Sequence, residues 1–171
     1  MFCRIVGWKG LEIFLEAARK SIGVNGNLKF VSVGGGSREL VNRYKQLSSE
    51  YGLDQRIIWL GEQSDLTGLL NMIDILTVAS TSGEGFPNII GEAMSTEKPV
   101  VATDVGDNTL IVKGGGLIIP PGDSDAMYHA WKQLVDSKSL RVKMGSVGRQ
   151  RVCDQFSLEV MIERTESSVF L

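Results

Sequence analysis

Residues 80–107, STSGEGFPNIIGEAMSTEKPVVATDVGD, follow one apolar run and contain a second, an arrangement that recurs along the chain. The run before this stretch, DILTVA (74–79), and the run inside it, PVVAT (99–103), are short and apolar, as buried strands are. The residues between the runs favour a helix, for which Asn88 is a suitable N-cap. A strand, a helix and a second strand in this order predict a βαβ unit with parallel strands.

The same alternation extends to both sides of this unit. Further strands are predicted at LKFVSV (28–33), RIIWL (56–60) and GLIIP (116–120). Apolar residues at helical spacing predict helices around residues 11–18 and 40–47, and at residues 123–136, 139–154 and 157–170. Asp123 is the expected N-cap of the third of these. The pattern predicts an α/β fold with a mostly parallel sheet and a single domain over residues 1–171.

Composition excludes several classes of protein. The chain has 171 residues, of which 43% are hydrophobic, and this is enough for one domain with its own core. Its 18 basic and 20 acidic residues leave a net charge of −2, which argues against a nucleic-acid binder. Without an apolar stretch of roughly 20 residues or a signal peptide, the expected location is cytoplasmic. The two cysteines, Cys3 and Cys153, are predicted to be buried thiols.

The N-terminal end departs from the repeating pattern. Met1, Phe2 and Cys3 are too few residues for a full strand before the first helix, so we expect the first strand to be truncated and part of the protein to lie upstream. At the other end, residues 157–171 are expected to form a C-terminal helix whose apolar residues, among them Leu158, Met161 and Ile162, are available for packing.

A glycine run, Gly34, Gly35 and Gly36, follows the predicted strand at 28–33. It matches half of the dinucleotide-binding fingerprint, but Glu39 stands where the third glycine belongs. Two interpretations remain open, a simple tight turn and a loop that faces a ligand.

Two carboxylates, Glu84 and Glu92, flank the start of the helix after residue 87 in a Glu-x7-Glu pattern. Both are expected at the carboxyl ends of the strands, where open α/β sheets bind ligands. The free amides at the helix start, and the helix dipole, favour a phosphate there. This is the outline of a diphosphate site. The alternative is that Glu92 only complements the dipole and Glu84 is a solvated loop charge.

Several segments together resemble one enzyme family, the group 1 (family four) retaining glycosyltransferases of the GT-B fold. EGFPNIIGEAM (84–94), KPVVATDVGD (98–107) and GLIIPPGD (116–123) follow the order and spacing of that family. RIVGWKG (4–10), VGGGSR (33–38), IIWLGE (57–62) and FSLE (156–159) add to the match. The resemblance covers nearly the whole chain and corresponds to the C-terminal, donor-binding half of a GT-B enzyme, a three-layer α/β/α Rossmann-like domain.

The resemblance also implies roles for individual residues. Arg4 and Lys9 would bind the diphosphate of a nucleotide-sugar donor, Glu92 the ribose hydroxyls, and Glu84 the sugar, so Arg4, Lys9 and Glu84 are the expected catalytic residues. Besides Glu92, the residues expected at the donor are Gly35, Leu60, Gly61, Phe86, Asn88 and Ile89.

The implied reaction is transfer of a hexose, with retention of anomeric configuration, from a UDP-, GDP- or ADP-linked sugar to a glycan or lipid-linked acceptor. Neither a cofactor nor a metal is expected. The acceptor would bind to a missing N-terminal domain, so the isolated chain should bind donor without efficient transfer. The enzyme would be expected to associate peripherally with the inner face of the membrane. The alternatives are half of a sugar-nucleotide epimerase and a non-catalytic module that binds a nucleotide sugar.

Three positions depart from the family pattern. Cys3 stands where the family usually has glycine before its arginine, and Pro87 replaces a frequent glycine, which removes one backbone donor from the sugar loop. Glu97 replaces a glycine that ends the helix, so we expect a left-handed backbone at a non-glycine residue, at a cost of about 1 kcal/mol.

Overall fold

Strands and helices alternate along the chain in the computed structural model, which describes residues 1–22 and 28–169. The strands of this part of the chain are β1 (Phe30–Val33), β2 (Ile57–Gly61), β3 (Leu76–Val78), β4 (Val100–Thr103) and β5 (Gly116–Ile119). The α-helices are α1 (Leu11–Ser21), α2 (Arg38–Glu50), α3 (Leu66–Met72), α4 (Asn88–Ser95), α5 (Asn108–Val112), α6 (Ser124–Asp136), α7 (Lys138–Phe156) and α8 (Leu158–Val169). A short 3₁₀ helix, η1 (Gly7–Lys9), precedes α1.

The predicted α/β class and the predicted strands are confirmed. All paired strands are parallel, with β1 beside β2 and with β4 between β3 and β5. Asp123 caps α6 by accepting a hydrogen bond from the Ala126 amide at 2.8 Å. Helices α3 and α5 were not expected from the sequence. The last two residues of the predicted C-terminal helix, 170 and 171, lie outside the described residues.

The strands form two ladders where the sequence predicts one sheet. In the described part of the chain, only the short extended segment Met1–Ile5 lies between β1 and β3, and it runs parallel to β1 with bridges from Phe2 to Val33 and from Ile5 to Gly36. This segment lies beside the C-terminal end of β1, so it leaves the N-terminal parts of β1 and β3 without a strand between them.

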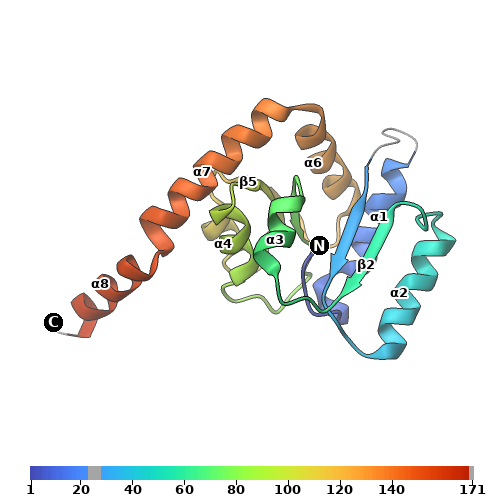
Figure 1. The fold of residues 1–171 in the computed structure, drawn as a ribbon, viewed down its shortest axis with the longest axis horizontal. Helices are drawn as coiled ribbons and strands as arrows, with labels where there is room; N and C mark the ends of the chain where they lie inside the picture. The colour runs from blue at the N-terminus through green and yellow to red at the C-terminus, as the bar shows by residue number, and fades with distance from the viewer. Residues whose placement is uncertain (23–27, 170–171) are drawn as a thin grey trace.

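Helices cover both faces of the strands, as the resemblance predicts for three layers (Figure 1). On one face Val101 packs in a core with Phe14, Phe30 and Trp131, which joins α1 and α6 to the sheet. On the other face the neighbouring residue Val100 belongs to a second core, which includes residues of α3, α4 and α5. Alternation of neighbouring strand residues between two cores is what burial on both faces requires.

Helix α7 packs against α4 along part of its length, where Gly145 and Gly148 are buried, and α8 extends away from the body of the molecule (Figure 1). Helix α8 is confirmed, and its apolar residues Leu158, Met161 and Ile162 are 61%, 57% and 46% exposed, so much of their surface remains open. Cys153 is also exposed, which contradicts the prediction of a buried thiol, whereas Cys3 is half-buried.

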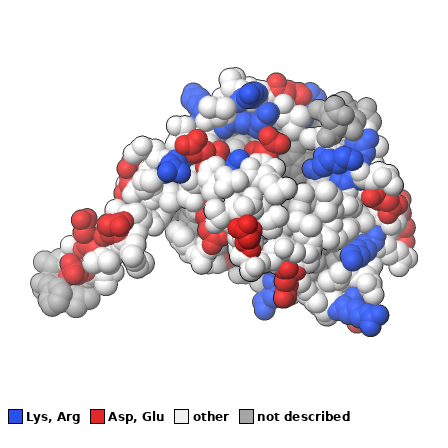
Figure 2. Space-filling view, viewed as in Figure 1, with Lys and Arg blue, Asp and Glu red and all other residues white. Residues whose placement is uncertain are grey.

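The surface has mixed charge. On the face shown in Figure 2, Lys and Arg side chains are interspersed with Asp and Glu, in keeping with the net charge of −2. Within residues 1–22 and 28–169, none of the helices combines the length and the hydropathy that crossing a bilayer requires.

Candidate functional site

Two of the predicted site residues meet although 75 positions separate them in the sequence. The Lys9 Nζ donates a hydrogen bond to Glu84 Oε1 at 2.5 Å. The side chains are 18% and 6% exposed, respectively, so the ion pair lies at the edge of the interior. Both residues lie near the carboxyl end of β3, the edge at which open α/β sheets bind ligands.

Backbone contacts hold Lys9 in this place. The Thr81 amide, just after β3, donates to Trp8 O at 2.8 Å, and Thr81 Oγ1 donates to the same oxygen at 3.2 Å. Gly10 has a φ of 70°, and a Cβ there would lie 1.9 Å from Ala79 O, so only glycine permits the approach. The Lys-Gly pair at residues 9–10 therefore docks η1 on the end of β3.

Glu84 is held by a second donor that the sequence did not reveal. The Ser80 hydroxyl donates to the same Oε1 atom that accepts from Lys9. Ser80 is fully buried, and its own carbonyl accepts from the Thr103 hydroxyl at 2.7 Å, which ties the end of β3 to the end of β4. The role of Ser80 depends on this packing between strands, for which the local sequence contains no signal.

The loop that carries Glu84 is also fixed against the loop after β4. A Cβ on Gly106 would lie 2.1 Å from Glu84 O, and the Asp107 amide donates to Gly85 O at 3.3 Å. Next to these residues, Asn108 is fully buried and donates to Thr103 O at 2.9 Å. The carboxylate of Glu84 therefore projects from a braced loop.

The start of α4 differs from the prediction. Pro87 is the N-cap residue and Asn88 is the first residue of the helix, so the expected capping by Asn88 is wrong. Proline has no amide hydrogen, and the first amides inside the helix, those of Asn88 and Ile89, have no earlier carbonyl of the helix to bind. Glu92 lies one turn into α4 and is exposed. These amides and the positive end of the helix dipole favour an anion near Glu84.

Arg4 lies on the extended N-terminal segment, is exposed, and is flanked by the glycine run. A Cβ on Gly34 would lie 1.9 Å from Cys3 O, and one on Gly36 would lie 2.4 Å from Ile5 O. Close backbone packing therefore explains these two glycines. Gly35 faces the side chain of Glu62, and whether it also faces a ligand is still a prediction.

The remaining predicted residues lie at the end of β2 and in the loop before α4. Leu60 and Gly61 end β2, where Leu60 is 36% exposed and Gly61 O accepts from the Gly34 amide at 2.7 Å. Phe86 is 48% exposed, and its ring packs edge-on against Phe156 of α7 with the ring centres 5.3 Å apart. The structure thus directs the Phe86 ring toward α7.

The charges of Lys9 and Glu84 influence the thiol of Cys3. Burial raises the pKa of Cys3, the N-terminal ammonium and Lys9 lower it, and Glu84 raises it again. In the part of the chain that the structure describes, no group of three or more His, Cys, Asp or Glu residues is arranged to hold a metal ion.

Comparison with known proteins identifies the family. The model of the family described as glycosyl transferases group 1 matches residues 1–137. The chain belongs to this family. Among curated relatives, the capsular polysaccharide biosynthesis glycosyltransferase CapM of Staphylococcus aureus is 30% identical over 169 residues, which are 96% of this chain and 43% of CapM. The chain therefore spans about half the length of such a relative.

Solved structures confirm the fold of this group 1 chain. Anabaena HepE, crystallised with UDP, superimposes with a TM-score of 0.90 at 26% identity and covers 98% of this chain, while 48% of HepE is matched. The C-terminal domain of a group 1 glycosyl transferase, LpcC of Francisella tularensis, gives a TM-score of 0.82 at 25% identity, with 92% of this chain and 85% of that domain matched.

Proposed function

We propose that this group 1 chain is the C-terminal, donor-binding half of a retaining glycosyltransferase that moves a hexose from a nucleoside-diphosphate sugar. The observation that carries the proposal is the Lys9–Glu84 ion pair, which lies at the carboxyl edge of the strands close to the start of α4. A cation and free helix amides suit the diphosphate, and carboxylates suit the hydroxyls of the sugar and the ribose.

The reaction requires stabilisation of a leaving group. When the bond between the sugar and the diphosphate breaks, negative charge accumulates on the departing phosphate oxygen. Lys9 and Arg4 would supply positive charge there, and the amides at the start of α4 would donate hydrogen bonds. Groups aimed at charge that develops during the reaction stabilise the transition state more than the ground state.

The carboxylates of Glu84 and Glu92 would bind different hydroxyl groups of the donor. Glu84 is held by Ser80 and Lys9, so its position is set before ligand binds, and it would accept hydrogen bonds from the sugar hydroxyls. Glu92, one turn into α4 and exposed, would accept both ribose hydroxyls. Gly35, Leu60 and Gly61 would contact the base and ribose side of the donor.

The acceptor would bind to an N-terminal half outside the present sequence. Three observations support this part of the proposal. The chain spans 43% of CapM, and it covers 85% of a structure described as a C-terminal domain. The exposed apolar residues of α8 are the kind of surface that packs against another domain. The isolated chain should therefore bind donor and transfer it poorly.

The names of the relatives and neighbours support the chemical class that we propose for donor and acceptor. HepE was crystallised with UDP, so UDP is the nucleotide to test first. A 30% identical relative from Escherichia coli is described as a galactosyltransferase acting on a diphosphoundecaprenol-linked sugar. CapM is described as a glycosyltransferase of capsular polysaccharide biosynthesis. A glycan or lipid-linked acceptor at the cytoplasmic membrane face fits both descriptions.

Titration calorimetry of the purified chain with UDP, GDP and ADP tests the proposal. We expect saturable heat with at least one of the three, and the preferred nucleotide reveals the donor base. UMP serves as the matched control, because it lacks the second phosphate and should bind more weakly. If none of the diphosphates binds at millimolar concentration, the donor-binding role is wrong.

A further inference from the structure

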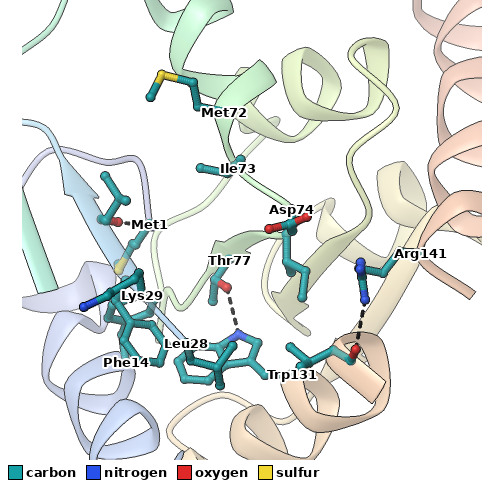
Figure 3. A pocket seen from close by; sticks show the side chains of 14 residues that line it. Met1, Phe14, Leu28, Lys29, Met72, Ile73, Asp74, Thr77, Trp131 and Arg141 are labelled. Carbon is teal, nitrogen blue, oxygen red and sulfur yellow. Dashed lines mark hydrogen bonds between the residues drawn. The ribbon is translucent and has the colours of Figure 1, made fainter. Parts of the chain in front are cut away.

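Of the three tryptophans in the chain, Trp8 is the one that lies outside the hydrophobic cores of the described residues. Trp131 lines the pocket shown in Figure 3, belongs to the core around Phe14, and donates from its indole nitrogen to Thr77 Oγ1 at 2.9 Å. Trp59 packs against the same core. Trp8 is half-buried in η1. Packing in a core therefore does not explain this large aromatic side chain.

The ring of Trp8 contacts two parts of the candidate site. The Lys9 Nζ lies 4.3 Å from the ring centre, within the range of about 6 Å in which the face of an aromatic ring attracts a cation. On the loop before Glu84, a Cβ on Gly83 would lie 3.4, 3.5 and 3.6 Å from three atoms of the ring, Cε3, Cδ2 and Cζ3. The ring therefore contacts both the lysine and the loop that carries Glu84.

The ammonium of Lys9 thus has two partners of different kinds. Glu84 Oε1 accepts its hydrogen bond at 2.5 Å, and the Trp8 ring attracts its positive charge. A lysine side chain has a flexible stem of four carbons, so a single partner leaves its ammonium considerable freedom. The Lys9 side chain is only 18% exposed, and the attraction between a cation and a ring is stronger where water is excluded. Together the two partners restrict where the charge lies.

The backbone of Trp8 has a role that is separate from its ring. The Trp8 carbonyl accepts from the amide and the hydroxyl of Thr81, at 2.8 Å and 3.2 Å, and these bonds hold η1 against the end of β3. A substitution at residue 8 changes the side chain and leaves the carbonyl in place. The effect of removing the ring therefore reports on its contacts with Lys9 and Gly83 rather than on the docking of η1.

We propose that Trp8 is a positioning residue whose ring holds the ammonium of Lys9 in place for the diphosphate of the donor. This inference rests on the proposed donor-binding function. Trp8 acts through Lys9, which faces the phosphate that leaves with the nucleotide. Loss of the ring should therefore weaken the binding of a nucleoside diphosphate more than that of the corresponding monophosphate, which lacks this phosphate.

Calorimetry of ring variants measures this difference, with the diphosphate that binds most tightly among UDP, GDP and ADP and with its monophosphate. Trp8→Leu removes the ring but keeps an apolar side chain, and it should weaken diphosphate binding by about 5- to 10-fold. Trp8→Phe keeps an aromatic face and should restore most of the affinity. Tyr51→Leu is the matched control, because it removes a ring that lies 4.9 Å from the guanidinium of Arg19, near the ends of α1 and α2.

A double-mutant cycle separates action through Lys9 from packing against Gly83. Lys9→Met removes the charge and keeps a long side chain. In that background Trp8→Leu should cause little further loss of diphosphate affinity, because no cation remains for the ring to hold. If removal of the ring weakens binding by the same factor with lysine and with methionine at residue 9, Trp8 acts through the loop at Gly83 and the inference is wrong.

Side-chain NMR of the chain without nucleotide tests the contact itself. Protons held over the face of an aromatic ring resonate upfield, so the methylene next to the Lys9 ammonium should be shifted upfield in the unchanged chain and should lose this shift in Trp8→Leu. An ordinary shift in the unchanged chain overturns the inference.

The binding data distinguish this inference from the proposed function. If the unchanged chain binds a diphosphate and Trp8→Leu binds it equally well, the inference fails and the donor-binding role stands. If no diphosphate binds to the unchanged chain, the donor-binding role is wrong and the inference fails with it, since the contact between Trp8 and Lys9 would then be structural alone.

Discussion

At the scale of single residues, Lys9 and Glu84 are more deeply buried than the partners of any other ion pair in the described parts of the chain. A buried ion pair is weak evidence for a role in stability, because desolvation offsets much of the attraction between the charges. Its position at the carboxyl edge of the strands supports the proposed role, in which the pair would hold both charges in place before the donor binds.

Replacing Lys9 by alanine should weaken binding of the preferred nucleoside diphosphate by about 10- to 100-fold. The lost hydrogen bond to a charged group contributes roughly 1.5–3 kcal/mol, and the uncompensated Glu84 carboxylate would repel phosphate. Calorimetry of Lys9→Ala measures the change. The matched control is Lys132→Ala, which removes an exposed lysine paired with Asp136. Equal affinities of the two variants would exclude Lys9 from the site.

Replacing Ser80 by alanine should lower both stability and nucleotide affinity. The variant leaves Glu84 with one donor fewer, which should reduce the free energy of unfolding by about 1 kcal/mol and weaken binding several-fold. Ser48→Ala is the control, because Ser48 is also buried and donates to a backbone carbonyl away from the site. If both variants bind nucleotide like the unchanged chain, Ser80 has a structural role alone.

The sequence supported these site residues unevenly. Lys9 and Glu84 stand out because family motifs carry them, whereas Ser80 acts through the packing of β3 against β4. Gly34 and Gly36 show how a motif can suggest a ligand contact where the glycines serve packing. A Cβ at either position would collide with the backbone of Cys3 or Ile5. A glycine run predicts a close approach but not which partner approaches.

At the scale of elements, the end of α4 combines a favourable motif with an unfavourable residue. Lys98 N donates to Ala93 O and Glu97 N donates to Met94 O, both at 3.0 Å, which is a Schellman ending. This ending places Glu97 at a φ of 59°, which confirms the left-handed backbone expected there. The neighbouring helix α7 leaves little room, since a Cβ on Gly145 would lie 2.1 Å from Glu97 O.

Glu97→Gly should therefore stabilise the chain. Glycine removes the left-handed strain, a gain of about 1 kcal/mol, and the lost ion pair with Arg149 is exposed and contributes little. Thermal unfolding should shift upward by about 2–4 °C. Glu97→Ala keeps the strain and removes the same charge, so it should not show the gain. A glycine variant no more stable than the alanine variant would contradict this account.

The strands could be predicted from the sequence more completely than the helices. Runs such as PVVAT are buried on both faces, so their composition alone identifies them. Helices α3 and α5 are short, and too few turns are present for a periodic pattern to emerge. The prediction that Asn88 is the N-cap of α4 is wrong. Both Asn88 and the preceding Pro87 suit the start of a helix, and in the structure Pro87 is the N-cap residue.

At the scale of the whole molecule, the sequence predicts a parallel sheet but not its division into two ladders. Which strands pair depends on contacts between distant segments, and the segment Met1–Ile5 reaches only the C-terminal end of β1. Its N-terminal amino group is buried there as a result.

This burial predicts a pH dependence of stability. The pKa of the Met1 amino group falls from 8.0 to about 5 because burial disfavours the charged form. Between these values the unfolded chain binds more protons, so stability should rise from pH 5 to pH 8 by up to about 1.4 kcal/mol per pH unit and then level off. Denaturant unfolding of the chain with and without Nα-acetylation isolates this contribution. Identical pH profiles would show that the amino group remains accessible to water.

The central claim, that the donor diphosphate binds between Lys9 and the start of α4, is tested most directly by backbone amide NMR during titration with UDP. We predict the largest shift changes at Lys9 and Gly10, in the loop at residues 83–87, and at Asn88 and Ile89. The amides of Val31, Ile75 and Thr77, in or beside β1 and β3, should move little. The claim is contradicted if UDP binds and the largest changes map to these three amides while Lys9 and Asn88 remain unshifted.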